Sequence, residues 1–162
     1  MENGISVEIG MDLTNEISLQ VIKDASEFKQ SECEVLHNNN MTGVKVSGQV
    51  LEASIKVDNK LYLLFTTDNV IFEESLNIFL IQFGKDSKVI DSATIGEMYS
   101  TGIFKDLRIR TEDSLEFYFM GDSAWRLTVY RKPQIKISFI NENRRVSRPV
   151  GFKRYFSVSE AE

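Results

Sequence analysis

The chain has 162 residues, of which 42% are apolar, and a formal net charge of -5 at pH 7. This length suits one domain, residues 1–162, that buries roughly two-thirds of the surface of its unfolded form. The single cysteine, Cys33, excludes an internal disulfide, and residues 1–13 carry acids where a signal peptide carries lysine or arginine. Its apolar stretches are shorter than the ~20 residues of a membrane helix. We expect a cytoplasmic protein without a membrane span.

The first forty residues show little periodicity. Ile17, Leu19 and Val21 alternate as in a strand, whereas residues 24–29 (DASEFK) offer Asp and Ser as N-caps for a short helix. Residues 37–40 (HNNN) have the composition of a turn. The sequence therefore predicts at most one or two short helices, all near the amino terminus.

From Thr42 onward, apolar residues recur at every second position, which is the period of a strand with one buried face. The Asp-Asn-Lys sequence at 58–60 predicts a tight turn between strands that contain Ile55 and Leu63. Turn signals also follow the strands expected at 76–83, 88–95 and 104–110. This spacing favours a mainly β fold, an antiparallel β-sandwich or barrel, over alternating strands and helices.

A further hairpin is predicted around Gly121 and Asp122, because alternating apolar residues precede and follow that pair. We expect Phe119 beside Trp125, and Phe117 beside Leu127, on the core face. Trp125 is expected in the core. The alternative is that it serves as a stacking platform for a sugar or a base.

The residues that usually carry catalysis or bind metals are scarce. With one histidine, His37, and one cysteine, the chain cannot build a zinc site from these residue types alone. The acids in Glu73-Glu74 and in Glu112-Asp113 are adjacent, so in a strand they point to opposite faces. His37 is interpreted as a loop residue rather than a member of a triad. We expect no enzyme activity, metal or cofactor, with a carboxylate-based enzyme as the least favoured hypothesis.

Positive charge is concentrated between residues 131 and 154, which hold eight basic residues and one acid, against 11 basic and 23 acidic residues elsewhere. Pro133 and Pro149 indicate an edge strand followed by a loop. The nearby aromatic residues Phe152 and Tyr155 suit contacts with single-stranded nucleic acid. The chain's pI of about 5.1 disfavours nucleic acid as a partner, and the segment equally suits contacts with its own acidic body.

Five segments carry a family resemblance, and their residue ranges are 61–68 (LYLLFTTD), 90–93 (IDSA), 99–104 (YSTGIF), 117–125 (FYFMGDSAW) and 148–156 (RPVGFKRYF). These segments resemble small bacterial immunity proteins of polymorphic or contact-dependent toxin systems. The resemblance implies a cytoplasmic, non-catalytic protein that binds one cognate toxin domain and covers its active site or substrate-binding surface.

An acidic body would complement a basic toxin such as a nuclease, because opposite charges speed encounter and fix orientation. The candidate partner-binding residues, all expected to be exposed, are Asp68, Glu73, Glu74, Asp91, Glu97 and Tyr99. The alternative function is a ligand-binding β module for carbohydrate or single-stranded nucleic acid. The sequence leaves the oligomeric state open, and an exposed edge strand would permit dimerisation.

Overall fold

The structure is a computed structural model that describes residues 10–68, 74–97, 100–135, 143–151 and 153–161. These residues form only strands and connections, without a helix. The strands are β1 (Asp12–Leu13), β2 (Ile17–Lys23), β3 (Glu32–His37), β4 (Asn40–Ser47), β5 (Val50–Lys56), β6 (Leu61–Thr67), β7 (Leu76–Gln82), β8 (Lys88–Ile95), β9 (Lys105–Ile109), β10 (Ser114–Tyr118), β11 (Ala124–Ile135), β12 (Val146–Ser147) and β13 (Lys153–Glu160).

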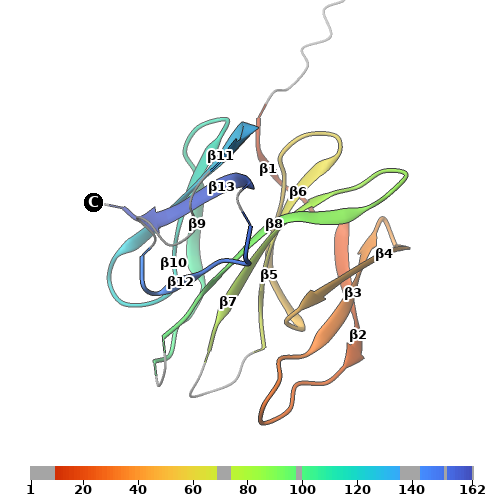
Figure 1. Ribbon diagram of the computed structural model, residues 1–162, viewed down its shortest axis with the longest axis horizontal. Helices are drawn as coiled ribbons and strands as arrows, with labels where there is room; N and C mark the ends of the chain where they lie inside the picture. Colours follow the sequence, from red (N-terminus) through yellow and green to blue (C-terminus); the bar gives the residue numbers. More distant parts are fainter. Residues whose placement is uncertain (1–9, 69–73, 98–99, 136–142, 152, 162) are drawn as a thin grey trace, which may run out of the picture.

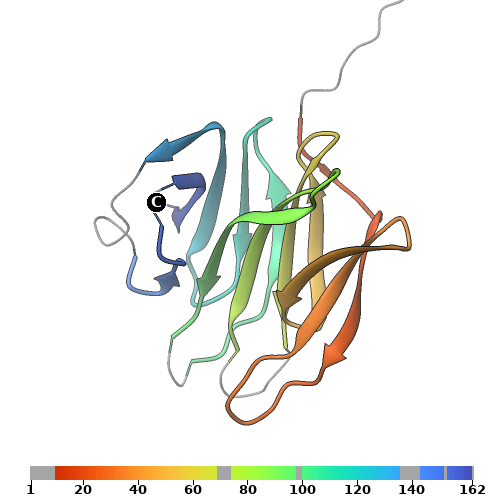
Figure 2. The same ribbon diagram turned by 45° about the vertical axis from the view of Figure 1, so that its right-hand side comes forward.

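The strands form three antiparallel sheets that pack on one another (Figures 1 and 2). The six-stranded sheet has the order β1-β5-β6-β7-β8-β12, the four-stranded sheet β13-β11-β10-β9, and the three-stranded sheet β2-β3-β4. One apolar cluster joins residues of the six- and four-stranded sheets, and a second joins the six- and three-stranded sheets. The predicted mainly β, antiparallel sandwich is therefore confirmed, with the six-stranded sheet as its middle layer.

The middle layer depends on strands that are apolar on both faces. In β6, Leu63 and Phe65 belong to the first cluster, whereas Tyr62 and Leu64 belong to the second. A nearly continuous apolar run, in place of strict alternation, is typical of a strand that is buried on both sides.

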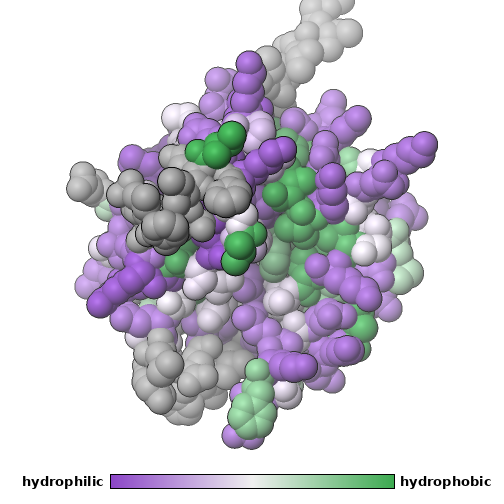
Figure 3. Space-filling view, in the orientation of Figure 1, coloured by the Kyte–Doolittle hydropathy of each residue, from purple (hydrophilic) through white to green (hydrophobic). Residues whose placement is uncertain are grey.

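The three-stranded sheet leaves part of the middle layer uncovered. On the face of the molecule that Figure 3 shows, apolar side chains gather near the centre, in the region of β8 and β4 in Figure 1. Phe79 of β7 and Val89 of β8 pack against the second cluster and stay half-buried.

Two predicted turns are confirmed. In the β5–β6 hairpin, Ile55 lies opposite Leu63, and the Asp58 carboxylate accepts hydrogen bonds from the main-chain N–H groups of the next turn residues. In the β3–β4 hairpin, Asn38 and Asn39 have φ values of 51° and 67°. Two successive positive φ values suit the twist of a two-residue hairpin, and asparagine tolerates them.

The register predicted for the β10–β11 hairpin is wrong by two residues. Phe117, not Phe119, lies opposite Trp125, and Leu115 lies opposite Leu127. Phe119 has left the strand, and its main-chain carbonyl accepts a hydrogen bond from Ile103 instead. The connection is consequently longer than the tight turn that the sequence predicts.

The helix considered for residues 24–29 does not form. This segment is a bend within the β2–β3 connection, closed by a hydrogen bond of 2.9 Å from Ser26 N to Lys29 O. Its one large apolar side chain, Phe28, is 88% exposed. So short a helix is unstable in water without an apolar face packed on the core, and this segment has none.

Candidate functional site

An open pocket of about 590 Å³ lies at one end of the six-stranded sheet. The β2–β3 connection forms one wall, and the opposite wall comes from residues at the ends of β6, β7, β8 and β12. Three of the six predicted partner-binding residues, Asp68, Glu74 and Glu97, line this pocket. Asp68 directly follows β6, Glu74 precedes β7 and Glu97 follows β8, so the pairing of these neighbouring strands brings the three acids to one end of the sheet.

Hydrogen bonds hold the β2–β3 connection against the sheet. The Asp68 carboxylate accepts hydrogen bonds from the main-chain N–H and the hydroxyl of Ser31. The Asp68 N–H donates to Glu74 Oε1 at 3.1 Å. Deeper in the sheet, the Asn77 amide donates to Gln30 Oε1 at 2.7 Å. The pocket wall is therefore tied to the sheet at two points.

A glycine at the β4–β5 turn allows this turn to pack closely against β6. Gly48 has a φ of 94°, and a Cβ atom there would overlap the Thr66 hydroxyl. The Thr66 hydroxyl donates to Ser47 O at 2.6 Å, which closes the turn onto β6. Any larger residue at Gly48 would displace this contact.

Negative charge dominates the pocket lining, where four carboxylates face one lysine, Lys29. Burial, and then the nearby Glu74 carboxylate, raise the pKa of Glu52 on β5. A positive group in the pocket would offset this repulsion. Glu97 is partly neutralised, because Arg145 Nε lies 3.2 Å from its carboxylate.

The rim of the pocket carries the exposed ring of Phe28 beside the exposed Glu27. Aromatic residues of this kind contribute much of the binding energy in protein interfaces once a partner buries them. The pocket thus combines acidic walls with one apolar anchor.

Two of the remaining predicted residues, Glu73 and Tyr99, lie outside the described residues. The expectation that Asp91 and Glu74 are exposed is wrong, since they are 5% and 8% exposed. Asp91 also does not line the pocket, and its carboxylate lies 2.7 Å from Arg148 Nη2. It accepts further hydrogen bonds from the N–H groups of Tyr155 and Phe156. Asp91 therefore fastens β8 to β13, across the two larger sheets.

The basic segment makes several ion pairs with the acidic body, as one of its two interpretations expected. Arg131 pairs with Asp113 at 2.7 Å, and Arg145 pairs with Glu160 at 3.1 Å. Trp125 is fully buried in the first apolar cluster, which confirms its prediction as a core residue. It is therefore not available as a stacking platform.

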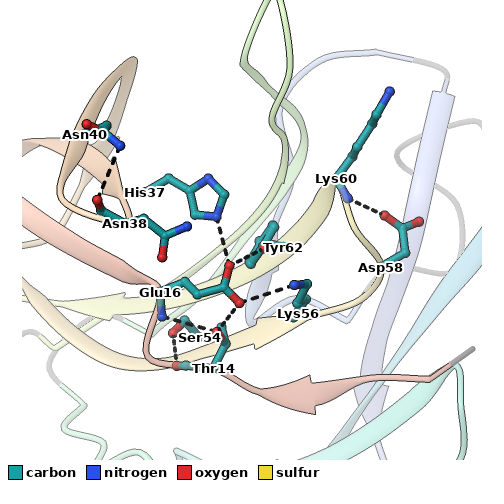
Figure 4. Close-up of polar contacts among 10 residues, drawn as sticks. All are labelled: Thr14, Glu16, His37, Asn38, Asn40, Ser54, Lys56, Asp58, Lys60 and Tyr62. Atoms are coloured by element: carbon teal, nitrogen blue, oxygen red, sulfur yellow. Dashed lines mark hydrogen bonds and ion pairs between the residues drawn. The ribbon is translucent and has the colours of Figure 1, made fainter. Parts of the chain in front are cut away.

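A second polar cluster, which the sequence did not predict, surrounds Glu16 (Figure 4). Its Oε1 accepts hydrogen bonds from His37 Nε2 at 3.1 Å and from the Tyr62 hydroxyl at 2.8 Å. Its Oε2 lies 3.0 Å from the Thr14 hydroxyl and 3.3 Å from Lys56 Nζ. The bond from His37, followed by that from Tyr62, contributes most to lowering the pKa of Glu16 to about 2.

His37 is therefore not a free loop residue, contrary to the interpretation from sequence. Its ring stacks on Phe83 with centroids 4.7 Å apart, and among the described residues its side chain hydrogen-bonds only Glu16. A nucleophilic triad requires a hydroxyl or thiol that is hydrogen-bonded to the histidine ring. Among the described residues, no such group bonds the His37 ring. The hydrogen bonds of this cluster connect the β1–β2 connection to β3, β5 and β6.

A shallow hollow of about 650 Å³ lies on the outer face of the four-stranded sheet. Glu116 at its edge pairs with Arg126 at 2.7 Å and with Arg110 at 2.9 Å. These hydrogen bonds, first that of Arg126, lower the pKa of Glu116. Because both acids that line the hollow, Asp113 and Glu116, already bind arginines, it has no excess of negative charge.

Within the described ranges, no group of three or more His, Cys, Asp or Glu side chains is placed to hold a metal ion. Those ranges also contain no helix with the length and hydropathy of a membrane span. The fold and pocket define an all-β protein of three stacked sheets with an acidic recess at the strand ends. Comparisons with protein-family models, curated proteins and solved structures gave no match.

Proposed function

We propose that the chain is a cytoplasmic, non-catalytic binding protein of the immunity type, which binds a cognate bacterial toxin domain and neutralises it. The acidic pocket beside the β2–β3 connection is the surface that meets the toxin. The observation that carries this assignment is the gathering of Asp68, Glu74 and Glu97 around one recess with Phe28 on its rim.

The chemistry of the pocket favours a partner with exposed lysine or arginine side chains, such as a basic nuclease domain. The described lining holds four carboxylates and one lysine, so its formal charge is negative. Complementary charge accelerates encounter, while a buried aromatic anchor slows dissociation. The two features together suit tight binding of a single partner.

The alternative ligand-binding module loses support at the first of its two proposed contacts, the Trp125 platform. Trp125 is enclosed in the core, and Arg131, Arg145 and Arg148 of the basic segment already bind acids. No specific feature of the described residues favours carbohydrate over a protein partner.

The direct test uses the catalytically inactivated product of the neighbouring gene as the binding partner, with calorimetry on the purified pair. We expect Phe28→Ser to weaken binding about thirtyfold, which is the effect of losing a hot spot worth ~2 kcal/mol. Ile135→Ser is the matched control, because Ile135 is also apolar and 81% exposed but lies at the end of β11.

Charge is tested separately by Glu27→Lys, which reverses one exposed acid at the pocket rim. This change should reduce the association rate about tenfold at low salt, whereas Glu112→Lys on the β9–β10 turn should not. If the inactivated toxin binds the wild type and all four variants equally, the pocket is not the contact surface. If the folded protein binds no such domain, the immunity assignment fails.

A further inference from the structure

The three-stranded sheet ends in an open strand edge. Strand β2 pairs only with β3 among the described strands. Asn38 N donates to Glu16 O at 2.7 Å, and Ile17 is the register partner of His37. Because hydrogen-bonded and non-bonded pairs alternate in an antiparallel ladder, the N–H and C=O groups of Ile17, Leu19 and Val21 point away from β3.

Two other terminal strands, β4 and β9, carry features that hinder strand addition. In β4, Gly43 has a φ of 79° and its N–H donates a hydrogen bond to the Glu34 carboxylate. In β9, Asp106 has a φ of 56°, and the register shifts beside a run of charged residues. Irregular backbone and charge are common means of preventing edge pairing.

The free edge of β13 is capped by side chains. Asp91 accepts the N–H groups of Tyr155 and Phe156, and Arg148 donates to the Phe156 carbonyl at 3.2 Å. Strands β1 and β12 contain only two residues each. By contrast, β2 is regular from Ile17 to Val21 and contains no glycine, proline or charged residue in that stretch.

Apolar side chains accompany the open main-chain groups of β2. Val21 is 45% exposed and Ile22 is 43% exposed. Strand β2 lies at the outer margin of the molecule (Figures 1 and 2). An edge with these properties is a template for another strand.

We propose that β2 pairs antiparallel with β2 of a second copy of this chain. The two three-stranded sheets then become one continuous six-stranded sheet across a two-fold axis at Leu19. In this register Leu19 faces Leu19 of the second copy, and Ile17 faces its Val21, so apolar residues meet on the core side. On the outer side Ser18 faces Gln20 of the second copy.

In this register, every residue of the regular stretch of β2 has a partner in the second copy. Its odd-numbered residues carry the outward main-chain groups, so their three pairings give about six hydrogen bonds. The β2 strand of a second copy has the same length and the same alternation of apolar and polar residues. The pairing involves only one strand of each copy, so the dimer is expected to have a dissociation constant of tens of micromolar or above.

Sedimentation velocity on the full chain, over about a hundredfold range of concentration, tests the proposal. The wild type should shift from monomer to dimer as concentration rises. Val21→Asp should weaken dimerisation at least tenfold, because it places a charge opposite Ile17 of the second copy. Met41→Asp is the matched control, since Met41 is 65% exposed on β4 of the same sheet.

A second variant separates edge pairing from a general surface effect. Leu19→Pro removes an N–H that β3 does not use, so the sheet should fold, as circular dichroism would confirm, while the dimer is lost. In the wild type, the amides of Ile17, Leu19 and Val21 should gain protection from hydrogen exchange at high concentration. A monomer throughout the range, or a dimer that survives both β2 variants, would overturn the proposal.

Discussion

Glu16 shows how one half-buried side chain can hold four segments together. It receives hydrogen bonds from Thr14, His37, Lys56 and Tyr62, and its pKa falls to about 2 from an ordinary value of 4.5. A carboxyl whose pKa is lower in the folded state stabilises the fold above its unfolded value. That contribution is present above pH 4.5 and disappears as the pH falls through 2.

We therefore expect Glu16→Gln to reduce the free energy of unfolding by about 1–2 kcal/mol at pH 7. The pKa shift alone corresponds to ~3 kcal/mol, and partial exposure of the cluster to solvent reduces it. Urea unfolding at several pH values would show the two proteins converging between pH 4.5 and 2.5. A difference that stays constant down to pH 2.5 would show that the charge of Glu16 is not responsible.

The pair of Asp91 and Arg148 is more deeply buried, with side chains 2% and 3% exposed. Asp91→Asn would leave the buried guanidinium without its carboxylate, and such changes typically cost 3–5 kcal/mol. Replacing both residues, as Asp91→Leu with Arg148→Met, should recover a large part of that loss. Denaturant unfolding of the single and double variants checks this, and a loss below ~1 kcal/mol for Asp91→Asn would contradict it.

At the level of single elements, alternation predicted most strands but not all of their partners. The bounds expected for β8 agree with the structure, and the hairpin around residues 58–60 has the expected partners. The β10–β11 register was missed because Phe119 belongs to the same apolar period but leaves the strand to bond Ile103. That contact joins residues 16 positions apart, and local sequence pattern does not encode it.

The candidate site was only partly predictable for the same reason. The charge of Asp68, Glu74 and Glu97 marks them as candidates in the sequence, and strand pairing brings them to one pocket. Asp91 has the same chemistry but points into a core where Arg148 neutralises it. The Glu16 cluster draws on residues from 14 to 62, whose proximity depends on how the sheets pack.

At the scale of the whole molecule, the middle sheet determines where each functional surface lies. One of its ends carries the acidic pocket, and the three-stranded sheet packed on it ends in the open edge of β2. These two surfaces involve different parts of the β2–β3 hairpin. The proposed binding of a toxin at the pocket and the proposed pairing at β2 can therefore be disrupted by different substitutions.

The proposed contact surface for the partner is the acidic pocket. Hydrogen exchange of the protein, alone and saturated with the inactivated toxin domain, locates that surface directly. We predict that amides of residues 24–31 and 94–97 gain protection in the complex, while the outer face of β9, β10 and β11 stays unchanged. Protection confined to the four-stranded sheet, with residues 24–31 exchanging as in the free protein, would contradict the proposed contact surface.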